Sequence, residues 1–96
     1  MQYDTRIQIK KINQGHEVFC SITQKNHSRF SEAQRITNVD FRLNGQIFAE
    51  ISVGEKLSKN PIIGVELILG KPGDVVSVHW SDDNMNRGDA HSRITP

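Results

Sequence analysis

The sequence is short of the features that disulfide-linked, nucleic-acid-binding and membrane-spanning proteins need. Its 96 residues include a single cysteine, Cys20, so no disulfide can form within the chain. Six aromatic side chains are too few and too scattered to stack on bases, and a formal net charge of +1 gives no electrostatic attraction for nucleic acid. No apolar stretch approaches the ~20 residues of a membrane span. We therefore expect a single domain, residues 1–96, with neither nucleic acid nor membrane as a partner.

Recognisable catalytic and cofactor-binding motifs are also missing. The sequence has no Gly-x-Ser-x-Gly motif, no glycine-rich phosphate loop and no pair of carboxylates on an identifiable cleft. Residues 70–74 contain Lys71 and two glycines, but Pro72 favours a β-turn over a phosphate-binding loop. These absences predict a protein that is not an enzyme and that holds no cofactor.

Four histidines raise the question of a metal site. If the chain from Trp80 to Ala90 closes a hairpin, His79 and His91 would face each other on its wet side. Three aspartates lie in the loop between these histidines: Asp82, Asp83 and Asp89. A zinc or copper site needs three or four converging ligands, and no recognisable ligand spacing is present. We therefore interpret these residues as solvated polar side chains and expect no metal.

What the sequence does contain is a series of short segments in which apolar and polar residues alternate. Turn signals separate these segments about every ten residues, and no helical period is convincing. The pattern predicts an all-β protein, an immunoglobulin-like antiparallel β-sandwich of about seven strands. The first segment has a charged outer face and is expected at a sheet edge. The predicted strands are residues 5–12, 16–24, 35–43, 46–53, 62–69, 76–80 and 90–95.

Residues 58–80 are the most informative stretch. An apolar run over 62–69 is followed by the turn residues 70–74 and then by alternating Val76, Val78 and Trp80. This order predicts two strands joined by a tight turn, that is, a central hairpin. Because it ends an inward-facing alternation, Trp80 is expected to anchor the core.

Asn44 and Gly45 indicate a second hairpin, between residues 35–43 and 46–53. A two-residue loop would oppose Phe41 to Phe48 and put the two apolar sets on opposite faces of the hairpin. A three-residue loop, with Gly45 left-handed in a bulge, aligns the apolar sets, with Val39 and Phe41 facing Ala49 and Ile47. We therefore predict the bulged turn and a positive φ at Gly45.

The segment 58–80 also resembles the SoxZ family. The resemblance rests on Ser58-Lys59-Asn60-Pro61, the apolar strand, the turn at 70–74, the string Val-Ser-Val-His-Trp and the acidic turn at 81–84. It is specific over about a third of the chain, and strand order and length agree for the rest. SoxZ is the small subunit of a heterodimeric carrier in bacterial thiosulfate oxidation, and its fold is a β-sandwich of the immunoglobulin class.

The resemblance implies a non-catalytic subunit of a sulfur-compound carrier. Its partner, SoxY, holds the sulfur intermediate on a cysteine in a glycine-rich carboxyl-terminal arm, in a heterodimer or heterotetramer that meets other thiosulfate-oxidation enzymes. This chain ends at residues 92–96 without such an arm, as expected for the companion subunit. Residues 1–6 lack the basic start and apolar middle of a signal peptide, which alone predicts the cytoplasm. The resemblance instead implies the periplasm, by co-export with a signal-bearing partner.

The candidate partner-binding residues are Lys59, Asn60, Pro61, Ile62 and Ile63. The strand at 62–69 has Glu66 as its only charge, so it lacks the protection that exposed edges need, and we expect its surroundings to border a partner-covered surface. Two alternatives stay open: residues 58–61 form only a turn that starts the strand, or the strand is central and buried on both faces.

Two other functions compete with the SoxZ-like one. The chain is either a thiol carrier or redox protein that acts through Cys20, or a sandwich interaction module unrelated to sulfur metabolism. Cys20 alternates with Val18 and Ile22 on one strand face, which favours a small core residue over a reactive thiol.

Overall fold

Seven antiparallel strands and no helix make up the part of the chain that the structure, a computed structural model, describes: residues 3–24, 36–52, 62–82 and 85–96. No helix in this part is long and apolar enough to cross a membrane. The strands are β1 (Tyr3–Ile12), β2 (Gly15–Gln24), β3 (Ile36–Leu43), β4 (Gln46–Ser52), β5 (Ile62–Leu67), β6 (Val75–Asp82) and β7 (Arg87–Arg93).

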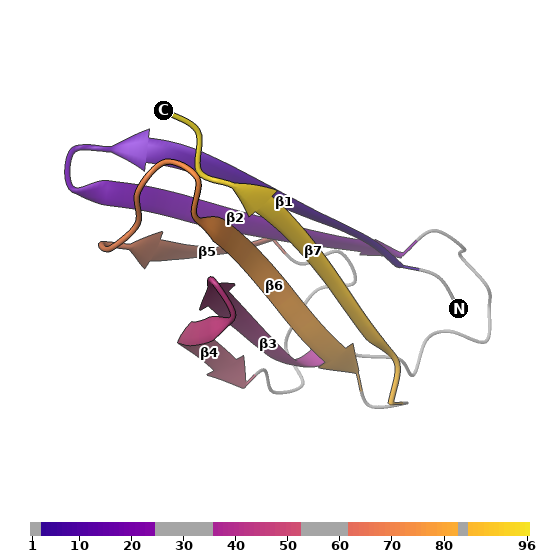
Figure 1. Ribbon diagram of the computed structural model, residues 1–96. Coiled ribbons are helices and arrows are strands. Elements are labelled where there is room, and N and C mark those ends of the chain that lie inside the picture. The colour runs from indigo at the N-terminus through magenta and orange to yellow at the C-terminus, as the bar shows by residue number, and fades with distance from the viewer. Residues whose placement is uncertain (1–2, 25–35, 53–61, 83–84) are drawn as a thin grey trace.

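The strands form two sheets, one of three strands in the order β1-β2-β5 and one of four in the order β4-β3-β6-β7 (Figure 1). The predicted all-β sandwich is confirmed, and β1 lies at a sheet edge as expected. In the constant-type immunoglobulin fold the fourth strand lies beside the fifth. Here β4 pairs with β3 instead, so the sheet that contains β5 has three strands.

The predicted central hairpin is wrong. β5 pairs with β2, whereas β6 pairs with β3 and β7, so the two segments lie in different sheets. Pro72 and Gly73 do form the predicted β-turn, because the Asp74 amide donates to the Lys71 carbonyl at 3.0 Å and Gly73 has a φ of 95°. That turn carries the chain from one sheet to the other. Ile68 and Leu69, which were expected in the strand, follow its end and are each 75% exposed.

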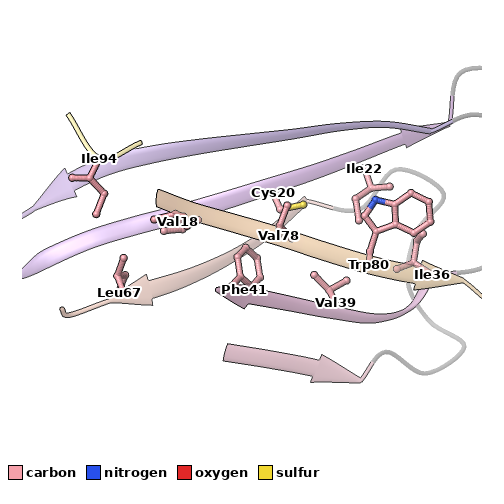
Figure 2. Close-up of a cluster of buried hydrophobic side chains, with 11 residues drawn as sticks. Val18, Cys20, Ile22, Ile36, Val39, Phe41, Leu67, Val78, Trp80 and Ile94 are labelled. Carbon is pink, nitrogen blue, oxygen red and sulfur yellow. The ribbon is translucent and has the colours of Figure 1, made fainter. Parts of the chain in front are cut away.

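The core lies between the inner faces of the two sheets (Figure 2). Strand alternation places Val18, Cys20 and Ile22 of β2 inward, opposite Phe41 of β3 and Val78 of β6, as the two-residue period predicts. The remaining buried apolar residues extend the core along the sandwich: Ile36, Val39, Leu67, Val76, Trp80 and Ile94.

The β3–β4 hairpin corrects the predicted position of the bulge. Asn44 and Gly45 form a two-residue turn, with φ values of 49° and 88°, and Leu43 pairs with Gln46. Positive φ at both central residues is the signature of the tight turn that Asn-Gly favours. The positive φ at Gly45 is confirmed, and the three-residue loop is wrong.

The bulge occurs further along the same hairpin. Arg42 pairs with Ile47 but Phe41 pairs with Ala49, which leaves Phe48 as the extra residue. The apolar faces of β3 and β4 still align, because the extra residue switches the side chains of β4 that follow it to the opposite faces of the sheet. Phe48 rather than Ile47 contacts Phe41, with ring centroids 6.2 Å apart, and Ile47 is 52% exposed.

Gly45→Ala is expected to lower the free energy of unfolding by roughly 1 kcal/mol or more, because a Cβ is disfavoured at positive φ. A Cβ at this position would have no neighbour within 4 Å, so the cost is conformational only. Urea unfolding measures it, with Gln46→Ala as the control at the adjacent exposed strand position. Equal stability of Gly45→Ala and the parent would contradict the left-handed turn.

Candidate partner-binding surface

Ile62 and Ile63 lie on opposite faces of β5. Ile62 is 76% exposed on the outer face, whereas Ile63 is half-buried, pairs with Cys20 and packs against the core. β5 is the last strand of its sheet, so the alternative of a central strand buried on both faces is wrong. Lys59, Asn60 and Pro61 lie outside the described residues.

A hollow of about 590 Å³ opens on the outer face of the three-stranded sheet, next to Ile62. Its lining comes from Arg6 and Gln8 of β1, Phe19 and Ser21 of β2, and Ile62 of β5, with the backbone neighbours Ile7 and Cys20. Cross-strand register explains the arrangement: Arg6, Ser21 and Ile62 form one row across the sheet.

Phe19 is the large apolar residue of this hollow that the sequence-based prediction did not include. It pairs with Gly64 of β5, and a Cβ built on Gly64 would lie 3.1 Å from the Phe19 ring. The missing side chain at Gly64 therefore makes room for the ring to lie over the edge strand. The signal was present, because an aromatic residue at an outward position between Val18 and Cys20 departs from the polar outer face expected of a one-sided strand.

The hollow is largely apolar, although polar side chains also line it. Arg6 Nε makes an ion pair with Asp4 Oδ2 at 2.9 Å, and the Arg6 side chain is 79% exposed. An exposed pair of this kind contributes little to stability. Phe19 and Ile62 are the two large apolar side chains that line the hollow from the outer face, as is typical of a protein-binding surface.

Cys20 lies beneath this face and is fully buried. Burial raises the pKa of its thiol from 9.0 to about 12, because the thiolate would lose its hydration. The nucleophilic thiolate is therefore scarce at neutral pH. The interpretation of Cys20 as a core residue is confirmed.

We expect native Cys20 to react with iodoacetamide at pH 8 at least about 100-fold more slowly than the urea-unfolded chain, since attack requires an exposed thiolate. Mass spectrometry over time measures both rates, and Cys20→Ser controls for labelling elsewhere. The unfolded thiol ionises first, near 9.0, so this group's contribution to stability is complete below that pH and is lost as the pH rises towards about 12. Native and unfolded rates within a few-fold of each other would contradict the buried thiol.

His79 and His91 lie on the outer face of the four-stranded sheet, whereas His16 is buried in β2 and His27 lies outside the described residues. β6 and β7 do pair as a hairpin, but His79 lies opposite Asp89 and His91 opposite Ser77, so the predicted facing of the two histidines is wrong. Across the other edge of β6, His79 lies opposite Asp40, which forms an ion pair with Arg42 at 2.7 Å.

Asp82 has a structural role at the β6–β7 connection. Its carboxylate accepts hydrogen bonds from the backbone N–H of Asn86 at 2.7 Å and from the side-chain Nδ2 of Asn86 at 3.0 Å. Asp83 lies outside the described residues. Among the residues that the structure describes, no three His, Cys, Asp or Glu side chains are grouped so that they could hold a metal ion.

Comparison with known proteins adds one match. The model of a family described as sulphur oxidation protein SoxZ matches residues 6–93, which is nearly the whole chain. No curated protein matches the chain. The matched range includes every residue of the hollow, the buried Cys20 and all of β5.

Proposed function

Because the chain belongs to the SoxZ family of sulphur oxidation proteins, we propose that it is the non-catalytic subunit of a heterodimeric sulfur carrier. In this role it binds a SoxY-type subunit and helps to present that partner's cysteine-bound sulfur intermediate to the enzymes of thiosulfate oxidation. It works in the periplasm, which it reaches by co-export with the signal-bearing partner, in a heterodimer or heterotetramer.

The burial of the only thiol in the chain carries this proposal. A residue that holds a transferable sulfur group must be reached by each enzyme in turn, whereas Cys20 is fully buried with a pKa of about 12. A thiol carrier that acts through Cys20 is therefore disfavoured. A protein without an accessible thiol contributes to sulfur transfer by binding, and the outward-facing apolar pair Phe19 and Ile62 offers a surface for it.

Mass measurement of the purified chain, alone and mixed with the SoxY-type subunit of the same cell, tests the proposal. We expect a defined complex with an interface of at least about 1,000 Å². Cys20→Ser should form the same complex and support the same thiosulfate turnover in the reconstituted system. Absence of a complex, or loss of turnover in a folded Cys20→Ser protein, would refute the proposed role.

Ile62→Asp is expected to raise the Kd of this complex by about tenfold or more, because it places a charge in a desolvated interface. The fold should persist, since Ile62 is 76% exposed. Ile63→Asp provides the contrast and should unfold the isolated chain, because Ile63 packs against the core. Met85→Asp, at an apolar residue that is 84% exposed in the β6–β7 connection, is the control. If Ile62→Asp binds the SoxY-type subunit with unchanged affinity, Ile62 does not lie in the interface.

A further inference from the structure

The two sides of the sandwich expose different kinds of edge. On one side β1 and β7 lie against each other, and Trp80 Nε1 donates to Thr5 Oγ1 at 2.7 Å between the sheets. On the other side β4 and β5 end their sheets, and no strand in the described part of the chain pairs with the outer edge of either. An edge strand with unpaired amide and carbonyl groups can pair with a further strand unless charge or a covering segment prevents it.

Apolar side chains gather at this second side. A groove of about 320 Å³ lies between the β3–β4 hairpin, at residues 43 and 46–48, and the end of β5, at residues 66–69. Three of its apolar side chains face solvent: Ile47 is 52% exposed, and Ile68 and Leu69 are each 75% exposed. None of the three belongs to the core cluster, and exposed apolar side chains that line one groove are typical of a surface that another molecule covers.

The charges next to β5 indicate the charge of the side chain that a molecule bound at this edge would place there. Lys10 of β1, Glu17 of β2 and Glu66 of β5 form one row across the outer face. Two carboxylates directly opposite each other repel. Lys10 flanks Glu17 on one side, whereas Glu66 is exposed and makes no ion pair with any described residue. A positive charge on a strand added beside β5 would complete the row.

We propose that the outer edge of β5 accepts an extended segment of the SoxY-type partner. The segment pairs with the β5 backbone, places a lysine or arginine opposite Glu66 and inserts an apolar side chain into the groove between β4 and β5. This assignment rests on the function proposed above and names the strand that the partner uses. A second copy of this chain fits less well, because β5 (IIGVEL) contains no basic residue that could lie opposite Glu66.

Charge reversal at Glu66 is the sharpest test. Glu66→Lys should raise the Kd of the complex at least about tenfold, because it places like charges together at the interface, and Glu66→Gln should have a smaller effect. The isolated Glu66→Lys chain should melt no lower than the parent, since the introduced ammonium group would lie opposite the carboxylate of Glu17. Weaker binding therefore cannot be attributed to unfolding.

A second pair of measurements tests the strand and the groove. Leu69→Asp should weaken the complex by at least about tenfold. Met85→Asp, at another exposed apolar residue that lies in the β6–β7 connection, should change the Kd less than about twofold. Amide hydrogen exchange should show new protection at alternate β5 positions on complex formation, because alternate amides of an edge strand point outward.

Each outcome decides the matter. If the wild-type complex forms but Glu66→Lys and Leu69→Asp bind like the parent, or β5 amides gain no protection, the β5 edge is not the docking site while the proposed function stands. If the isolated chain self-associates through β5 and these variants abolish that association, the occupant is a second copy instead. If no complex forms with the wild-type chain, both proposals fail.

Discussion

Trp80→Ala is expected to lower the free energy of unfolding by about 3–5 kcal/mol, a large share of the ~5–15 kcal/mol that stabilises a domain. The residue is only 5% exposed at the end of β6, and its Nε1 donates to Thr5 Oγ1 at 2.7 Å, which ties β1 to the opposite sheet. The ring also lies directly over Gly88 of β7, because a Cβ built there would overlap ring atom Cζ2. Truncation therefore leaves a cavity and removes the donor to the Thr5 hydroxyl between the sheets.

Thermal unfolding measures this effect, and a loss of this size corresponds to a fall in melting temperature of well over ~10 °C. Trp80→Phe is the matched control, because it keeps much of the ring volume and removes the hydrogen bond, so it should cost about 1–3 kcal/mol. A Trp80→Ala protein that melts within a couple of degrees of the parent would show that the ring does not anchor the core.

Gly15→Ala is expected to lower the free energy of unfolding by about 2–5 kcal/mol, because it combines a disfavoured φ with overpacking. Gly15 has a φ of 101° where β2 begins, and a Cβ there would overlap the Leu67 carbonyl oxygen and lie 3.0 Å from the Ile68 Cα. Both neighbours are backbone atoms, so β5 itself would have to move. The absent side chain at Gly15 thus allows the end of β5 to approach the β1–β2 hairpin.

Comparison with Gly45→Ala separates the cost of the disfavoured φ from the cost of overpacking. Gly45 also has a positive φ, but a Cβ there would have no neighbour within 4 Å. The difference between the two variants in denaturant unfolding therefore measures the contact with β5. If Gly15→Ala costs no more than Gly45→Ala, β5 does not approach Gly15 as closely as the structure shows. Gly15→Ala should also weaken partner binding, because displacing residues 67 and 68 alters the groove.

The candidate surface was only partly predictable from the sequence. The weak charge of the segment 62–69 drew attention to β5, which the structure places at a sheet edge. The period-two pattern separates outward Ile62 from inward Ile63. Phe19 and Ile47 were not included, because their places on the surface depend on how strands pair. Phe19 lies over Gly64, which is distant in the sequence, and Ile47 is turned outward by a bulge in β4.

The sequence by itself determined the number of strands, the inward faces of β2, β3 and β6, and the buried cysteine. Each of these depends on the two-residue period within one segment. In β2, for example, every second residue from Val18 to Ile22 is apolar, and these residues, Val18, Cys20 and Ile22, are buried. The position of Asn44 and Gly45 likewise determined a turn, since positive φ is a local property of these residues.

Only the tertiary structure decided which strands are neighbours. The apolar runs of β5 and β6 looked like one hairpin because they are close in sequence, yet among the described strands β5 pairs with β2 on one side only and β6 pairs with both β3 and β7. Backbone pairing is nearly independent of side-chain identity, so local pattern does not choose between partners. The choice depends on how both sheets together bury the core, and it leaves β5 at an edge with Glu66, Ile68 and Leu69 facing solvent.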